Sequence, residues 1–143
     1  AKRRYLQADL QRWAEIRDLP FRWPSRFPML TVVPLRVVLQ LEGEARRVAS
    51  EAIYRAYWGA DLNIADPTVL GEVLTAAGFD AEALLAGCSS AEVKATLRSN
   101  TEELLGRGGI GAPAFLVGDL HFWGQDRFEL VERALQGWRP EGE

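Results

Sequence analysis

The chain has 143 residues, a length typical of one domain, and 48% of them are hydrophobic, which is enough to form a buried core. Its formal net charge of −3 argues against a nucleic-acid partner, because phosphate contacts require a basic face. A single cysteine excludes a disulfide framework, a cysteine-rich zinc site and a Cys-x-x-Cys pair, and a single histidine argues against histidine-based metal sites. No apolar run is long enough to span a membrane, so we expect a cytoplasmic protein without a membrane partner. The low cysteine and histidine counts lead us to expect no metal.

Helical periodicity dominates the chain up to about residue 107. Asp66-Pro67 and Asp80 are typical helix starts, and Ser89-Ser90-Ala91-Glu92 fits a capping box. The predicted helices cover, in chain order, residues 2 to about 17, 31–41, 44–58, 67–77, 81–87 and 90–105.

Residues 19–28 lie between the first two predicted helices and contain three prolines that alternate with aromatic side chains. Proline lacks an N–H and fixes φ, so this stretch predicts a packed, extended loop and not a helix. We expect Trp13, Trp23 and Trp58 to anchor the core and Cys88 to be a packed, unreactive thiol.

The pattern changes after residue 107, where a glycine-rich run is followed by short apolar stretches. Residues 114–117 and 120–123 predict two strands around a tight turn at Gly118-Asp119, and a final helix is predicted from Gln125 to about Gln136. The predicted fold class is therefore mainly α with a small β part. Two strands alone form a marginal sheet, so this hairpin is expected to need further strands.

Two places could bind a small peptide-like ligand. Pro113 begins a predicted strand, and a cis Ala112-Pro113 bond would turn the Ala112 peptide groups outward, although only about one X-Pro bond in twenty is cis. Gln125 and Asp126 open the final helix, where a carboxylate group could bind or Asp126 could accept a hydrogen bond from an ammonium group. The alternatives are a trans proline on an edge strand and two side chains that only cap a helix. His121 is expected to be structural or exposed.

Several segments together resemble the 2-hydroxychromene-2-carboxylate isomerases, a branch of the DsbA-like thioredoxin superfamily related to the kappa-class glutathione transferases. The resemblance is collinear over essentially the whole chain, and the Trp-Gly-Gln-Asp-Arg ending is its most specific part. The segments that carry it are Lys2–Leu6, Asp9–Ala14, Leu19-Pro20-Phe21 with Pro24 and Phe27-Pro28, Ala56-Tyr57-Trp58, Ile64–Pro67, Gly109–Phe115 and Phe122–Arg127.

This resemblance implies a helical insertion domain at residues 1–107, followed by the C-terminal β-β-α half of a thioredoxin fold at residues 108–143. It also implies that glutathione is the cofactor and that the Ala112-Pro113 bond is cis. By position, the glutathione-binding residues would be Ala112, Pro113, Gln125 and Asp126. The implied activity is glutathione-dependent cis-trans isomerisation of an aromatic carboxylate in aromatic catabolism.

In that family a strand-helix-strand unit precedes the helical part and carries a serine that activates the glutathione thiol. This sequence begins inside the helical part, so we expect that N-terminal half and its serine to be absent, which leaves no catalytic residue here. Either the chain is a fragment of a longer protein, or the first half is supplied elsewhere. The serines of the helical part lie at other positions: Ser25, Ser50, Ser89, Ser90 and Ser99. We therefore expect this chain alone to lack isomerase activity.

The substrate is expected to bind between the helical block and the thioredoxin half, with Phe21, Trp23 and Phe27 as walls of its pocket. The unpaired sheet predicts a homodimer or another form of self-association. Three alternatives to the isomerase remain: a DsbA-like thiol-disulfide oxidoreductase, a kappa-type glutathione transferase and a non-catalytic helical binding module.

Overall fold

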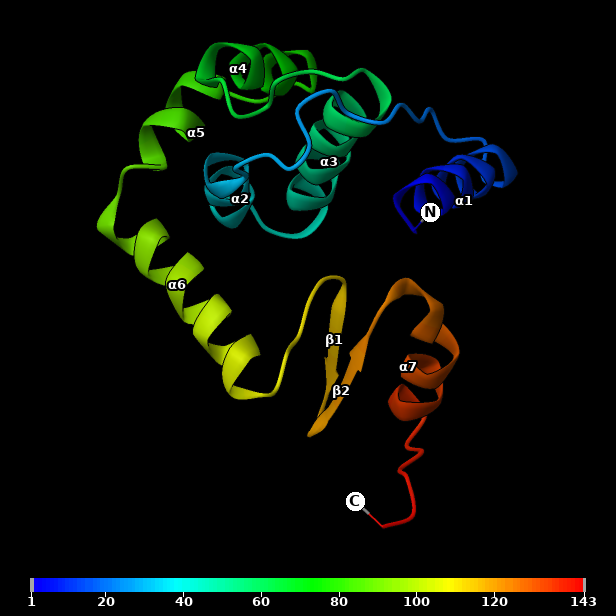
Figure 1. The fold of residues 1–143 in the computed structure, drawn as a ribbon. Coiled ribbons are helices and arrows are strands. Elements are labelled where there is room, and N and C mark those ends of the chain that lie inside the picture. Colours follow the sequence, from blue (N-terminus) through cyan, green and yellow to red (C-terminus); the bar gives the residue numbers. More distant parts are fainter. Residues whose placement is uncertain (1, 143) are drawn as a thin grey trace. The chain divides into compact units, whose positions relative to one another are not determined.

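The computed structural model describes residues 2–142, which form two compact units divided between Leu97 and Arg98 (Figure 1). We call residues 2–97 the helical unit and residues 98–142 the C-terminal unit, and we describe each by itself. The division falls inside a long helix, α6 (Ala91–Gly106). The sequence places its domain division at 107/108, directly after that helix, and this assignment stays a prediction.

The helical unit matches the predicted helices closely. Its third helix passes at its C-terminal end into a π-helical turn, η1, so that the single helix predicted over residues 44–58 is two elements. The elements of this unit before α6 are α1 (Lys2–Ile16), α2 (Val32–Leu39), α3 (Gly43–Tyr54), η1 (Arg55–Gly59), α4 (Pro67–Ala76) and α5 (Ala81–Gly87).

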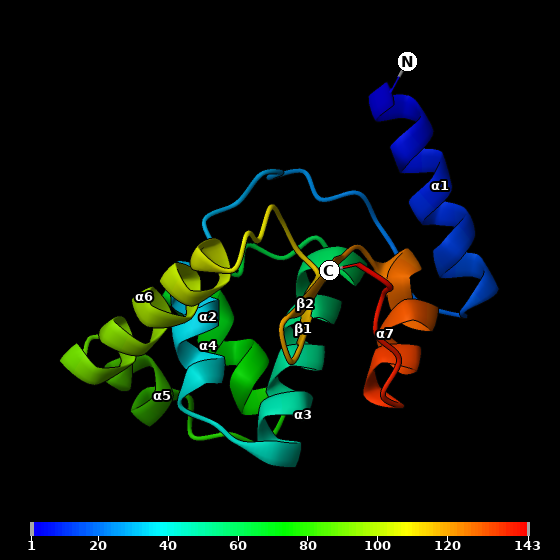
Figure 2. The same cartoon turned by 90° about the horizontal axis from the view of Figure 1, so that it is seen from below.

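The core of the helical unit lies where α2, α3, α4 and α5 pack together (Figures 1 and 2). Val37 of α2, Ala49 of α3, and Leu70 and Leu74 of α4 are completely buried. Leu70 and Leu74 lie one helical turn apart, so both face the same side of α4. Cys88 follows α5 and is also buried, and burial raises the pKa of its thiol. The prediction of a packed thiol is confirmed.

Side-chain caps begin three of the helices. Asp66 accepts a hydrogen bond from the Thr68 N–H at 2.9 Å and Asp80 accepts one from the Ala83 N–H at 3.0 Å, as predicted. For α6, Ser90 accepts from the Val93 N–H at 3.2 Å, whereas the Ser89 hydroxyl donates back to the Ala86 carbonyl. The predicted capping box is wrong by one residue, because the cap is Ser90 and Glu92 then lies outside the box position.

Gln40, directly after α2, connects that helix to α5. Its amide nitrogen donates to the Arg36 carbonyl at 3.0 Å and to the Leu84 carbonyl at 2.9 Å, and it lies 3.5 Å from the Cys88 sulfur. Gly87 leaves the space for this amide, because a β-carbon at that position would collide with the Gln40 side chain. A side chain at position 87 would therefore displace this amide.

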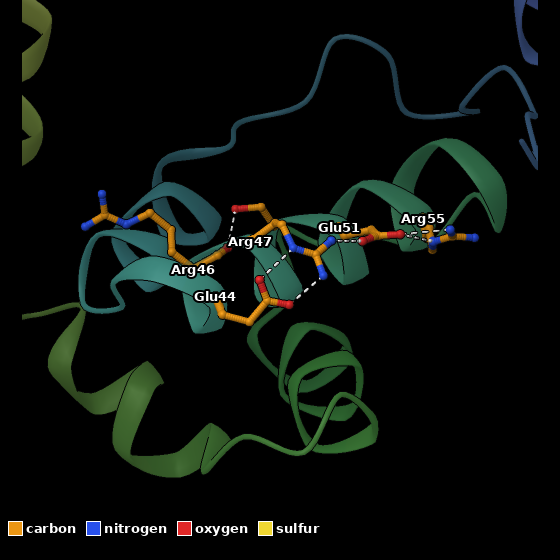
Figure 3. A network of polar contacts seen from close by, with 6 residues as sticks. Glu44, Arg46, Arg47, Glu51 and Arg55 are labelled. Carbon is orange, nitrogen blue, oxygen red and sulfur yellow. Dashed lines mark hydrogen bonds and ion pairs between the residues drawn. The ribbon is translucent and has the colours of Figure 1, made fainter. Parts of the chain in front are cut away.

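The outer surface of α3 carries a row of alternating charges (Figure 3). Arg47 pairs with Glu44 at 2.6 Å and with Glu51 at 3.0 Å, and Glu51 pairs with Arg55 at 2.8 Å. The Arg55 hydrogen bond lowers the pKa of Glu51. These residues are three or four positions apart and solvent-exposed, so the row supports the helix without fixing its position in the unit.

Tryptophan positions agree only partly with the sequence analysis. Trp23 and Trp58 are half-buried and pack together, with ring centroids 6.2 Å apart. Trp13 is 49% exposed, and the Arg17 guanidinium lies over its ring. The prediction that Trp13 anchors the core is therefore wrong, because Ala14 is the buried residue of this part of α1.

The C-terminal unit consists of the end of α6, an antiparallel hairpin and a final helix. Its strands are β1 (Ala114–Val117) and β2 (Leu120–Trp123), as predicted, and they pair Phe115 with Phe122 and Leu116 with His121. A short 3-10 turn, η2 (Gln125–Arg127), precedes α7 (Phe128–Leu135), whereas the sequence predicts one continuous helix from Gln125. None of the helices in residues 2–142 is long and apolar enough to cross a membrane.

Candidate functional site

The first candidate site lies in the C-terminal unit, at the residues before β1. The Ala112-Pro113 peptide bond is cis, as the family resemblance implies. Ala112 and Pro113 are exposed, and the Pro113 carbonyl accepts a hydrogen bond from the Gly124 N–H at 3.0 Å. Within residues 2–142 no backbone hydrogen bond involves Ala112. Its N–H and C=O groups are therefore open to an external peptide.

Gln125 and Asp126 lie at the start of η2, directly after Gly124, whose N–H donates to the Pro113 carbonyl. Neither side chain caps the turn, so the capping alternative is not what the structure has. The Asp126 carboxylate is exposed and pairs with the Arg127 guanidinium at 2.7 Å. Gly124 has a φ of 106°, and a β-carbon there would lie 2.6 Å from an Asp126 oxygen. A glycine at this position lets the Asp126 carboxylate fold back over the turn.

Trp123 also lies at this site, although no pattern in the sequence assigns it a binding role. Its indole is half exposed and lies against Gly111, where a β-carbon would be 2.7 Å from the indole nitrogen. The ring therefore flanks the segment that leads into Ala112. The available signal was the glycine directly before the Ala-Pro pair, since a glycine beside a site often marks a close approach of another group.

These groups can bind the two ends of a peptide-like ligand. A carboxylate such as Asp126 accepts hydrogen bonds from an ammonium group, and the Gln125 amide can donate to a carboxylate. The open Ala112 peptide can pair with an extended backbone. Within the described residues, no group of three His, Cys, Asp or Glu side chains could hold a metal ion.

The second candidate site is an apolar pocket of about 410 Å³ in the helical unit. Its volume is in the usual range for small-molecule sites, and it has no charged side chain among its lining residues. The lining comes from the proline-rich loop (residues 19–30), α2 and the residue before it, α3, η1 and the segment before α4: Phe27, Pro28, Met29, Thr31, Pro34, Leu35, Val38, Ser50, Ile53, Tyr54, Tyr57, Trp58 and Ile64.

Of the three predicted wall residues, Phe27 lines this apolar pocket together with Trp58, and their ring centroids lie 5.9 Å apart. Phe21 and Trp23 pack behind them. Phe21 stacks on Trp58 with centroids 6.0 Å apart, and Trp23 meets Phe27 edge-on at 5.0 Å. A substrate role for the three residues stays a prediction.

The polar side chains that line the apolar pocket carry hydroxyl groups, and no sequence motif points to them. The Tyr57 hydroxyl donates to the Arg26 carbonyl at 3.1 Å, and burial raises the pKa of Tyr57. Tyr54 also lines the pocket and is 64% exposed. Helical spacing alone could have placed Ser50, Tyr54 and Tyr57 on one face of α3 and η1.

Comparisons with known proteins identify the family. The family model described as a DSBA-like thioredoxin domain matches residues 1–136. The chain belongs to this family. Its fold is the mainly α, DsbA-like arrangement predicted from the sequence, with the C-terminal hairpin and helix in place.

Several proteins of known name or structure are similar to this chain. The chain is 28% identical to a 2-hydroxychromene-2-carboxylate isomerase of Sphingobium xenophagum, over 94% of this chain and 68% of that protein. It is 30% identical to glutathione S-transferase kappa 2 of Caenorhabditis elegans, over 91% of this chain and 64% of that protein. A solved 2-hydroxychromene-2-carboxylate isomerase superposes with a TM-score of 0.81 at 25% identity, over 94% of this chain and 66% of that chain. This chain thus spans about two thirds of the length of these relatives.

Proposed function

We propose that the protein carrying this sequence is a glutathione-dependent isomerase of an aromatic substrate of the 2-hydroxychromene-2-carboxylate type. The observation that carries this proposal is the match to named isomerases over nearly the whole chain. The kappa-class relative and the DsbA-like family support glutathione as the cofactor. The single cysteine and the mild acidity are the sequence support for a cytoplasmic location, which stays a prediction.

Glutathione would bind at the first candidate site, and the residues there fit it. The exposed Asp126 carboxylate would bind the γ-glutamyl ammonium group, and Gln125 would bind the adjacent carboxylate. The open peptide of Ala112, at Pro113, would pair with the cysteinyl backbone. When bound, glutathione would supply the thiol that adds to the conjugated double bond of the substrate and leaves again after rotation.

The apolar pocket would bind the aromatic part of the substrate. Its uncharged lining favours a ring system and disfavours a buried carboxylate, which would lose its hydration without a paired charge. The ring would therefore enter beside Phe27 and Trp58, while the carboxylate would remain in solvent. Phe21 and Trp23 would support this wall from behind.

Calorimetry with glutathione tests the cofactor site. In the whole protein that carries this sequence, Asp126→Ala should weaken glutathione binding by about 1–3 kcal/mol, because it removes one charge-assisted partner. Asp119→Ala, at the exposed hairpin turn of the same unit, is the matched control and should bind as the unmodified protein does. Equal affinity of the two variants would contradict the assignment of Asp126.

Turnover assays test the reaction. The expected result is glutathione-dependent isomerisation of 2-hydroxychromene-2-carboxylate by the protein that carries this sequence.

The similarity to the kappa-class relative makes glutathione transfer the second candidate. Conjugation of an electrophilic chloronitrobenzene without isomerisation would favour the transferase. Cys88 is buried with a raised pKa, which gives no support to a thiol-disulfide role for this thiol. Neither activity, with the fold intact, would favour the non-catalytic binding module.

We also propose self-association as a homodimer through the hairpin. Within residues 2–142 the sheet has only β1 and β2, so each strand has one edge without a partner strand. Unpaired edges favour pairing with another chain. Sedimentation velocity at increasing protein concentration should show a dimer, and a monomer at all concentrations would contradict this proposal.

A further inference from the structure

The proline-rich loop forms one wall of the apolar pocket without any regular structure of its own. It contributes Phe27, Pro28 and Met29 to the lining, and it has neither a helix nor a strand between Leu19 and Leu30. Backbone hydrogen bonds of a helix or sheet therefore cannot hold this wall. Its position depends on contacts with the rest of the helical unit.

Asp61, in the turn after η1, makes the most specific of these contacts. One carboxylate oxygen accepts from the Ser25 N–H at 2.7 Å and from the Ser25 hydroxyl at 3.0 Å. The other oxygen lies 4.0 Å from the Arg22 guanidinium, and the Asp61 side chain is only 17% exposed. The Ser25 N–H lowers the pKa of Asp61, so the carboxylate is the accepting form at neutral pH.

Two further contacts hold the loop on either side of Ser25. The Arg22 N–H donates to the Trp58 carbonyl at 2.6 Å, and the Arg26 carbonyl accepts from the Tyr57 hydroxyl at 3.1 Å. All three attachment points belong to η1 or to the turn that follows it. Asp61 has a φ of 58°, a conformation in which Asp and Asn are tolerated better than most residues.

We propose that Asp61 is a positioning residue of the apolar pocket: through Ser25 it holds the proline-rich loop so that Phe27 stands opposite α2 and α3. Asp61 is not itself among the lining residues, so its effect on a ligand is indirect. Phe27 lies two residues after Ser25, and the only other hydrogen bond described between them is the one that the Arg26 carbonyl accepts from the Tyr57 hydroxyl. The inference rests on the apolar pocket named in the proposed function, but it requires neither glutathione nor isomerisation.

Naphthol is a suitable probe, because it is an uncharged bicyclic aromatic with one hydroxyl and matches the uncharged lining. Its dissociation constant is measured by calorimetry at neutral pH on the 143-residue chain, with glutathione absent. Asp61→Ala removes both Ser25 bonds and should weaken naphthol binding about tenfold. Asp61→Asn keeps an oxygen acceptor and tolerates the backbone conformation, so it should restore most of the affinity.

Control variants make the result decisive. Leu35→Trp should fill the apolar pocket and abolish naphthol binding, and Asp119→Ala should change nothing. If Asp61→Ala does not fold by circular dichroism, Ser25→Ala, which loses only the hydroxyl bond, should still show a smaller loss of affinity. The inference is overturned by unchanged affinity in folded Asp61→Ala, by equal losses in the Asn and Ala variants, or by no naphthol binding to the unmodified chain. None of these outcomes depends on the glutathione and turnover assays, which judge the proposed function separately.

Discussion

The helical unit and the C-terminal unit bury their apolar side chains very differently. Among residues 2–142, all buried hydrophobic residues lie in the helical unit except Ala134, which belongs to the C-terminal unit. In the C-terminal unit Ile110 is 72% exposed and Leu135 is 71% exposed. The helical unit therefore forms a core from its own elements, whereas the C-terminal unit has almost no buried core, although both units also expose large apolar side chains.

The difference shows what holds each unit together. Apolar burial between helices stabilises the helical unit, since burial is the main favourable contribution to folding. The C-terminal unit depends on the hydrogen bonds of the hairpin and on the contact between β1 and α7, where the ring centroids of Phe115 and Phe128 lie 5.3 Å apart. A two-stranded sheet of this kind is marginal alone.

The largest expected effect comes from deleting a core side chain. Leu70→Ala should lower the free energy of unfolding by about 2–5 kcal/mol, because it leaves a cavity in a completely buried position. Leu135→Ala, in the exposed part of α7, should change it by no more than about 0.5 kcal/mol. Urea denaturation followed by circular dichroism measures both. Equal effects of the two variants would contradict the proposed contrast between the units.

An intermediate effect is expected at the helix starts. Asp66→Ala removes the cap of α4 and should cost about 1 kcal/mol. Gln125→Ala is the matched change in the C-terminal unit, and it should cost less than about 0.5 kcal/mol, because Gln125 makes no cap bond. Thermal unfolding of both variants sharpens the comparison. A larger loss from Gln125→Ala would show that η2 has a structural role.

The smallest effect is expected from the charged row on α3. Folding lowers the pKa of Glu51, so its pairs with Arg47 and Arg55 add stability above the ordinary glutamate range and lose it as the pH falls through the lowered value. Glu51→Gln should therefore lower the stability slightly at neutral pH and low salt, and the difference from the unmodified protein should fade at acidic pH and in high salt. Urea denaturation at several pH values checks this, with Glu82→Gln, whose side chain makes none of these pairs, as the control.

Much of the fold was predictable because its local signals are strong. Asp66-Pro67, Asp80 and the Gly118-Asp119 turn each fix the start or reversal of an element through hydrogen bonds between near neighbours. The π-helical turn η1 was not predictable, since Arg55–Gly59 has the same apolar spacing as an ordinary helix end. The exposure of Trp13 was also not predictable, because periodicity gives a face but not the neighbour that covers it.

The candidate site was predictable in part for the same reason. Ala112, Pro113, Gln125 and Asp126 were identified from motifs, but the bond from Gly124 to Pro113 that links the two segments depends on the hairpin register. The apolar pocket could not be predicted as a whole. Its walls come from segments between Phe27 and Ile64 that only tertiary packing brings together. Asp61 has no motif at all, because its partner Ser25 lies 36 residues away in the sequence.

The bond between Gln40 and the end of α5 has a consequence for how this sequence can change. A β-carbon at position 87 would force the Gln40 amide to move, because that amide occupies the space beside the Gly87 backbone. Gly87→Ala alone should therefore disturb the Gln40 bonds to the Arg36 and Leu84 carbonyls, whereas the same change after Gln40→Ala should have a smaller effect, since those bonds are already lost. The two positions therefore form an epistatic pair, in which the effect of one substitution depends on whether the other is already present.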